Sequence, residues 1–207
     1  MIQPRATRGT GLLEGFLARR RALMAGRLLP PAPRDGCVVD IGCGSHPLFL
    51  LSAPFRRNIG LDRVTSPAMV EALRTQGVEM IHHDLEADAA LPLADCSADA
   101  VTMLAVIEHI PPERRARLLQ DARRVLKPGG RVVLTTPAAW TVFILQFLSR
   151  TGFVSHEEIE EHHELLSGRG LRRLLEGAGF GRVRRGSFEA GLNLWATGER
   201  MEDAPGT

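Results

Sequence analysis

Three aspartates lie where strands are predicted to end, and their side chains could bind a ligand at the edge of a sheet. They are Asp40, Asp62 and Asp84. Asp62 follows Asp40 by roughly 20 residues, the spacing at which an acid can reach ribose hydroxyls. Each carboxylate has two oxygens that accept hydrogen bonds, which suits a diol, an exocyclic amine or a cation. One such aspartate could simply cap a helix or a turn, but three at consecutive strand ends indicate a binding site.

The turn Gly42-Cys43-Gly44 follows an apolar run that contains Asp40, as expected where a buried parallel strand ends. Glycine has no Cβ, so this turn can bend sharply and lie against a bound molecule. A dinucleotide site could begin in the same way, but its diphosphate needs a third glycine and a helix amino terminus. Here Ser45-His46-Pro47 follows instead. The turn therefore favours a ligand with a cationic linker over one with a diphosphate.

His109 is the best candidate for a general base, because it comes just after a predicted strand and imidazole titrates near neutrality. The alternative is that Glu108 and His109 only organise the loop before Pro111. His46, beside the glycine turn, is a weaker candidate. Cys43 as a nucleophile would need a nearby histidine base, and packing within the turn is the favoured role for it.

The composition predicts one domain with a real core, since the chain has 207 residues and a formal net charge of +2. Lys127 is the only lysine, so the basic residues are almost all arginines. We interpret the run Arg19-Arg20-Arg21 as a solvated helix face rather than an anion-binding patch. No basic stretch with interleaved aromatic residues is present, so a nucleic-acid partner is not expected.

The cysteines Cys37, Cys43 and Cys96 are odd in number, which favours free thiols in a reducing compartment. Arginines interrupt any apolar targeting segment near the start of the sequence. No stretch approaches the roughly 18 apolar residues that a membrane span requires. We therefore expect a cytoplasmic protein.

Helical and extended patterns alternate along most of the chain. We expect helices at 11–29 (a cover helix), at 67–74, 111–126 and 168–177, and a short one from Pro47. We expect strands at 37–41, 58–61, 78–82, 100–104, 131–135, 183–188 and 192–197, the last two forming an antiparallel pair. This alternation is typical of an α/β fold, in which helices cover both faces of a parallel sheet. Ligands of such sheets bind beyond the carboxyl ends of the strands, where the three aspartates would lie.

Seven short motifs occur in a specific order over most of the chain. They are Val39-Asp40-Ile41-Gly42-Cys43-Gly44, Gly60-Leu61-Asp62, Asp84-Leu85, Leu91-Pro92-Leu93, Asp99-Ala100-Val101, Ile107-Glu108-His109 and Leu126-Lys127-Pro128-Gly129-Gly130. Together they resemble the class I S-adenosylmethionine-dependent methyltransferases, and among these the methyltransferase type 11 group. The resemblance implies a Rossmann-like, seven-stranded, mostly parallel sheet whose last strand pair is antiparallel. It also implies S-adenosylmethionine as the cofactor.

The same resemblance assigns roles to the strand ends. It implies that Asp40 and the glycine turn face the methionine portion of the cofactor, Asp62 the ribose, and Asp84 the adenine. The cofactor-binding residues predicted in this way are Asp40, Gly42, Cys43, Gly44, Asp62, Arg63, Asp84, Leu85, Leu104 and Ala105. The expected parts are a cover helix region at 1–35, the methyltransferase domain at 36–199 with a helical insertion on the acceptor side at about 138–166, and a tail at 200–207.

No metal requirement is predicted. Some quinone-pathway relatives carry a glutamate for metal three positions before the Glu-His pair, and Ala105 stands there in this chain. The tract from His156 to Glu164 has histidines and acids, but His156 and His162 do not share a helix face at the spacing that metals use. An acidic, solvated helix is favoured for this tract.

The segment 140–154 is unusually apolar for a connection between a strand and a helix. Helical cover over the active site is the leading interpretation. The alternative hypothesis is a partly lipidic or aromatic acceptor, or shallow contact with a membrane, which is not expected. Ser155-His156-Glu157-Glu158-Ile159 and His162 also resemble a subgroup of these enzymes seen with genes for cell-surface polysaccharides and lipids.

The function expected is S-adenosylmethionine-dependent methyl transfer to a small-molecule acceptor, which could be linked to a lipid or a saccharide. One alternative is a non-catalytic regulator or partner subunit that binds S-adenosylmethionine. A second alternative is a nicotinamide-dependent reductase. The missing third glycine and the absence of any tyrosine disfavour that reductase.

Overall fold

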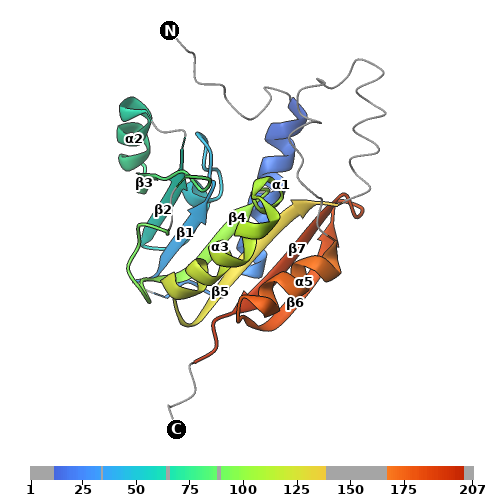
Figure 1. The fold of residues 1–207 in the computed structure, drawn as a ribbon. Helices are drawn as coiled ribbons and strands as arrows, with labels where there is room; N and C mark the ends of the chain where they lie inside the picture. The colour runs from blue at the N-terminus through green and yellow to red at the C-terminus, as the bar shows by residue number, and fades with distance from the viewer. Residues whose placement is uncertain (1–11, 34, 64–65, 88–89, 139–166, 203–207) are drawn as a thin grey trace.

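A seven-stranded sheet forms the centre of the computed structural model, which describes residues 12–33, 35–63, 66–87, 90–138 and 167–202 (Figure 1). The strand order in this described part is β3-β2-β1-β4-β5-β7-β6. The strands are β1 (Cys37–Ile41), β2 (Arg57–Asp62), β3 (Val78–His82), β4 (Ala98–Leu104), β5 (Leu126–Pro137), β6 (Gly181–Phe188) and β7 (Asn193–Glu199). Strands β1 to β5 are parallel, and β7 is antiparallel to both of its neighbours. The predicted α/β fold class is confirmed.

Helices cover both faces of the sheet, as Figure 1 shows. They are α1 (Leu12–Leu28), α2 (Pro67–Arg74), α3 (Pro112–Val125) and α5 (Gly168–Gly177), with short 3₁₀ helices η1 (Leu50–Ser52) and η2 (Ile107–His109). Local signals begin two of them: Ser66 accepts a hydrogen bond from the Met69 N–H at the start of α2, and Ser167 accepts one from the Gly170 N–H at the start of α5. Among the described residues, no helix has both the length and the apolar character needed to cross a membrane.

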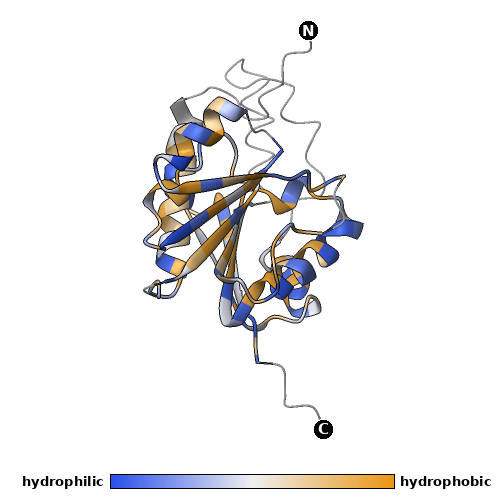
Figure 2. Ribbon diagram, turned by 90° about the vertical axis from the view of Figure 1, so that its left-hand side faces the viewer, coloured by the Kyte–Doolittle hydropathy of each residue, from blue (hydrophilic) through white to orange (hydrophobic). Residues whose placement is uncertain are grey.

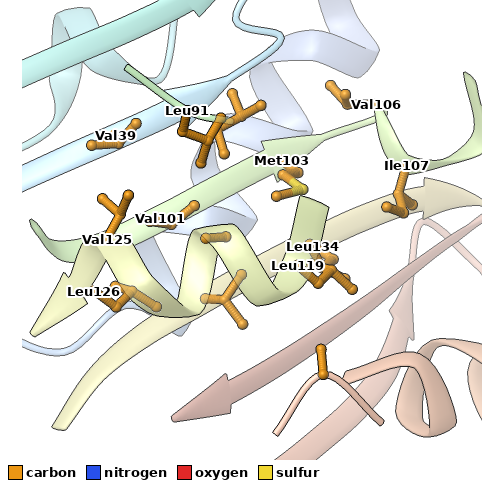
Figure 3. Close-up of a cluster of buried hydrophobic side chains, with 14 of the residues drawn as sticks. Val39, Leu91, Val101, Met103, Val106, Ile107, Leu119, Val125, Leu126 and Leu134 are labelled. Atoms are coloured by element: carbon orange, nitrogen blue, oxygen red, sulfur yellow. The ribbon is translucent and has the colours of Figure 1, made fainter. Parts of the chain in front are cut away.

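Two hydrophobic cores lie on the two faces of the sheet. In β1, Val38 and Val39 are both fully buried, since successive side chains of a strand point to opposite faces. Val39 belongs to the core under α3 and α5, part of which is drawn in Figure 3. Val38 belongs to the core under α1, η1 and α2. Strands that are buried on both faces read as continuous apolar runs, and Figure 2 shows this as orange along the centre of the sheet.

The short helix expected to begin at Pro47 is a 3₁₀ helix and not an α-helix. Only the single turn η1 forms there, and Ala53 after it is already extended, with ψ 133°. Ala53 precedes Pro54, and the proline ring disfavours helical geometry in the residue before it. The glycine turn is therefore followed by an irregular loop and not by an α-helix.

Helix α1 packs through only part of its predicted apolar set, of which Leu28 lies against the core. Phe16 and Leu23 belong to the predicted apolar set, but they are 55% and 58% exposed. The packed side instead carries small residues, with Ala25 fully buried and Ala22 partly buried against the same core. Small side chains allow the helix to approach the sheet closely.

Strand β5 begins earlier than expected, at Leu126, because Leu126 pairs with Ala98 before a shift in the register between β4 and β5. The chain also remains bound to the sheet at the start of the tail that was predicted at 200–207. Glu199 is the last residue of β7. The Arg200 backbone N–H donates to the Gly130 carbonyl at 2.8 Å, and its Nη1 donates to the Leu126 carbonyl at 2.6 Å.

Gly60 in β2 provides a test of how tightly the core under α1 is packed. A Cβ at this position would lie 2.6 Å from Met80 Sδ and 2.7 Å from Cys43 Sγ. We expect Gly60→Ala to lower the free energy of unfolding by about 1–3 kcal/mol, the usual cost of overpacking. Chemical denaturation measures this change.

Gly26→Ala in α1 is the matched control, because a Cβ there meets no atom within 4 Å. The control should raise stability by about 0.5–1 kcal/mol, since alanine favours the helix more than glycine does. Equal stability of Gly60→Ala and the wild type would contradict the packing described here.

Candidate functional site

The three aspartates lie on adjacent strands at the carboxyl edge of the sheet. Strands β3, β2 and β1 are neighbours in the sheet order. Asp40 pairs in register with Gly60, and Asp62, the last residue of β2, pairs with His82 at the end of β3. Asp84 follows His82 by two positions. The topology therefore brings these three predicted site residues to one edge of the sheet, where they form a row across adjacent strands.

The turn after β1 requires glycine. Gly42 has a φ of +70° and Gly44 a φ of +71°, in the left-handed region that glycine occupies without strain. The backbone N–H groups of Gly42 and Cys43 both donate to the Leu61 carbonyl, at 2.8 Å and 3.3 Å. A Cβ on Gly42 would lie 2.6 Å from Val106 Cγ2. The turn is thus held between the end of β2 and the loop that follows β4.

Asp62 joins this turn to β2. Its Oδ2 accepts a hydrogen bond of 2.7 Å from the Gly44 backbone N–H. The side chain of Asp62 is half-buried, whereas the next residue, Arg63, is exposed. Asp62 therefore has a fixed position beside the glycine turn, which suits a carboxylate that must meet a ligand in one orientation.

Asp40 is the most buried of the three acids, at 3% exposure. The hydroxyl of Thr102, in the neighbouring strand β4, donates to Asp40 Oδ1 at 2.6 Å. Thr102 is itself fully buried. Sequence reasoning missed Thr102, although a hydroxyl within the apolar strand β4 was a usable signal, since buried polar groups need partners.

An open pocket lies over Asp40, and the space of about 360 Å³ between its walls includes open solvent. It is lined by Ala18, Arg21, Ala22, Asp40, Gly42, Cys43, His46, Pro47, Leu48, Phe49 and Leu104. Helix α1 forms one wall, and the turn after β1 forms another.

The interpretation of the arginine run as a solvated face holds for Arg19 and Arg20, which are exposed. It is wrong for Arg21, which is partly buried in this pocket.

Asp84 is held by a local turn. Its Oδ1 accepts a hydrogen bond of 2.9 Å from the Glu86 backbone N–H, as in an Asx turn. Leu85 is partly buried against the core under α3. Asp84 therefore occupies the far end of the acidic row with a defined side-chain orientation.

The end of β4 borders the same pocket. Leu104 lines the pocket, and the next residue, Ala105, has a φ of +58°. Its backbone N–H donates to the Thr135 carbonyl at 2.9 Å, which helps to hold this conformation. A non-glycine residue with positive φ is uncommon and often occurs at functional sites. No feature of the sequence signals this conformation.

The Glu-His loop after β4 is fastened from α3. Arg115 is buried within α3, and its Nε donates to the Ile110 carbonyl at 2.7 Å, while Nη2 lies 3.5 Å from the Glu108 carbonyl. Glu108 is also buried, but His109 is exposed. The loop is therefore rigidly placed, and the His109 side chain is accessible.

The two weaker candidates have different surroundings. His46 is exposed at the rim of the pocket. Cys43 is buried, with its Sγ 3.9 Å from Met80 Sδ and 3.6 Å from the Gly44 carbonyl. The buried thiol fits the packing role that was favoured for Cys43 over nucleophilic catalysis.

Among the described residues, no group of three or more His, Cys, Asp or Glu side chains could hold a metal ion. The tract from His156 to Glu164 and the apolar segment 140–154 lie outside the described residues, as does nearly all of the predicted insertion.

Comparison with known proteins identifies the family. A family model described as a methyltransferase domain matches residues 13–184. The chain belongs to this methyltransferase-domain family. The match begins within α1, covers β1 to β5 and α5, and ends within β6, before β7.

Individual relatives are also named as methyltransferases. A probable S-adenosylmethionine-dependent methyltransferase of Mycolicibacterium smegmatis is 35% identical over 126 residues, which are 60% of this chain and 46% of that protein. A ubiquinone biosynthesis O-methyltransferase of Pseudomonas aeruginosa is 32% identical over 126 residues, 55% of this chain and 53% of that protein. The chain spans about half the length of the curated relatives that it matches.

Solved structures share the fold. The putative methyltransferase from the complex with the Haloferax volcanii Trm112 methyltransferase activator has a TM-score of 0.69 at 21% identity, over 91% of this chain and 93% of that chain. A possible histamine N-methyltransferase of Thermotoga maritima has a TM-score of 0.65 at 22% identity, over 91% and 96% of the two chains. These similarities confirm the Rossmann-like architecture predicted from the sequence.

The burial of the cysteines predicts their reactivity. Cys96 is exposed, whereas Cys37 and Cys43 are buried, and burial raises the pKa of the Cys37 thiol. Since the thiolate is the reactive form, iodoacetamide should modify only Cys96 in the folded protein and all three cysteines after denaturation. Mass spectrometry of peptides measures the modification. Rapid modification of Cys43 in the folded protein would contradict its packing role.

Proposed function

We propose that this protein is a cytoplasmic enzyme that transfers a methyl group from S-adenosylmethionine to a small-molecule acceptor. The observation that carries this proposal is the row of acids on β1, β2 and β3 beside a glycine turn that no α-helix follows. A diphosphate would need the amino terminus of such a helix. A nucleoside joined to a cationic amino acid needs carboxylates instead, and the row supplies them.

The residues present fit this cofactor by their chemistry. Asp40 lies buried at the base of a pocket, where a carboxylate can accept hydrogen bonds from an ammonium group. Asp62 presents a carboxylate beside the turn, and its two oxygens have lone pairs for a ribose diol as well as for Gly44. Asp84 has the same capacity toward the exocyclic amine of adenine.

The remaining predicted residues complete this proposal. Gly42, Cys43 and Gly44 would let the ligand lie against the backbone of the turn. Arg63 and Leu85 would border the ribose and the adenine, and Leu104 with Ala105 would border the methionine portion. Support comes from the position of all of them at the carboxyl ends of β1 to β4.

The chemistry requires positioning more than reactive side chains. When bound, the cofactor supplies a methyl group on a positively charged sulfur, and a lone pair of the acceptor bonds to that carbon while the carbon–sulfur electron pair returns to sulfur. The work of this chain is to align the two reactants and exclude water, and alignment can lower a barrier by about 7–11 kcal/mol. The rigid turn and the fastened loop after β4 are suited to that role.

His109 is proposed as the base that takes the proton leaving an oxygen or nitrogen acceptor. Its side chain is exposed, and its loop is held by Arg115 from the neighbouring helix. Relatives and solved neighbours include an O-methyltransferase and a possible N-methyltransferase, which supports an acceptor with a dissociable proton. The acceptor would approach from the side of the helical insertion proposed at about 138–166.

The ribose role of Asp62 predicts a loss of affinity in Asp62→Asn. A hydrogen bond to a charged group contributes about 1.5–3 kcal/mol, so binding of S-adenosylhomocysteine should weaken about 10- to 100-fold. Isothermal titration calorimetry measures this affinity. The control is Asp35→Asn, an exposed acid paired with Arg56, which should bind as the wild type does. Tight binding of NADH in place of S-adenosylhomocysteine would favour the reductase alternative.

The base role of His109 predicts a loss of turnover without a loss of binding. A general base contributes about 10²–10⁴-fold, so His109→Ala should lower kcat by that factor on an acceptor found by screening metabolites. The affinity for S-adenosylhomocysteine should not change. If kcat stays within a few-fold of the wild type, His109 has no such role and only shapes the loop.

A further inference from the structure

The pocket over the glycine turn has Arg21 of α1 and Asp40 of β1 among its lining residues. Both residues line this pocket, so it contains a guanidinium from the helix and a buried carboxylate from β1. Arg21 is partly buried, and its Nε atom is shielded from solvent. The pocket thus combines one positive and one negative group, together with the turn of Gly42 and Gly44.

Two features hold α1 in the position that places Arg21 there. The first is the stripe of small residues Ala18, Ala22 and Ala25, of which two line the pocket and the third is fully buried. The second is the ion pair between Arg20 Nε and Glu189 Oε1 at 3.5 Å, whose acid is 7% exposed.

Glu189 is itself held in the turn between β6 and β7. The amide of Asn193, the first residue of β7, donates to Glu189 Oε2 at 2.6 Å. A well-oriented acid of this kind pairs more favourably than a mobile surface group. The consecutive arginines therefore have different roles: Arg20 pairs with Glu189 in the turn between β6 and β7, and Arg21 lines the pocket.

We propose that Arg21 binds the α-carboxylate of the cofactor's methionine portion, while Asp40 binds its α-ammonium group. This inference rests on the proposed function and assigns a residue outside the sheet to the same site. A free amino-acid end carries both charges, and the pocket has a group of opposite sign for each. Guanidinium is suited to the task because its planar N–H donors match the two oxygens of a carboxylate.

Ligands that differ only at the amino-acid end test this assignment. S-adenosylhomocysteine carries the whole amino acid, whereas 5′-methylthioadenosine lacks it. Decarboxylated S-adenosylmethionine keeps the ammonium and the sulfonium and lacks only the carboxylate that S-adenosylmethionine has. Calorimetry on the full chain would compare the wild type with Arg21→Ala, Arg21→Lys and Arg19→Ala. Arg19 is the matched control, since it is exposed on the same helix outside the pocket.

The expected result is a loss that depends on the carboxylate. Arg21→Ala should weaken the binding of S-adenosylhomocysteine about 10- to 100-fold, which is the effect of losing one charge-assisted hydrogen bond. The affinity of Arg21→Ala for 5′-methylthioadenosine should stay within about two-fold of the wild-type affinity, because contacts other than Arg21 bind that ligand. The preference of the wild type for S-adenosylmethionine over its decarboxylated form should disappear in Arg21→Ala and persist in part in Arg21→Lys. Arg19→Ala should bind every ligand with the wild-type affinity.

Two results would overturn the assignment. If Arg21→Ala loses affinity equally for S-adenosylhomocysteine and 5′-methylthioadenosine, Arg21 only supports the fold of the pocket. Unchanged affinity for all four ligands would mean that Arg21 does not contact the cofactor. If the wild type binds none of the four, the proposed function itself fails, and the assignment fails with it.

Discussion

The turn between β1 and the loop after it is the constraint on which the site depends. Two residues with positive φ, Gly42 and Gly44, bring backbone N–H groups onto the Leu61 carbonyl and the Asp62 carboxylate. Val106 occupies the space that a side chain on Gly42 would need. One short turn therefore connects the ends of β1, β2 and β4. Such preorganisation lowers the cost of ordering the site when a ligand binds.

Both helical layers contribute to this edge of the sheet. From one face, Arg115 of α3 binds the carbonyls of the loop that carries His109. From the other face, α1 supplies a wall of the pocket and the side chain of Arg21. The sheet holds the acids, and the layers on either side hold the groups that surround them.

Much of the fold could be predicted because its signals are local. The bounds of β1, α2, β3 and α5 agree with the predictions. A buried apolar run before a glycine turn defines β1, and Ser66 with Pro67 defines the start of α2. The short helix expected from Pro47 is a single 3₁₀ turn, because Pro54 disfavours helical geometry at Ala53. The early start of β5 depends on pairing with Ala98, which no local pattern reveals.

The sequence by itself determined that Asp40, Asp62 and Asp84 stand at the ends of strands, since apolar runs and turn residues mark those ends. The tertiary structure decided which neighbours those acids have, such as the Thr102 hydroxyl on Asp40. It also separated Arg21 from Arg19 and Arg20, which no pattern within the helix could do. Consecutive residues of a helix point in different directions, and only packing against the sheet selects the direction that faces the pocket.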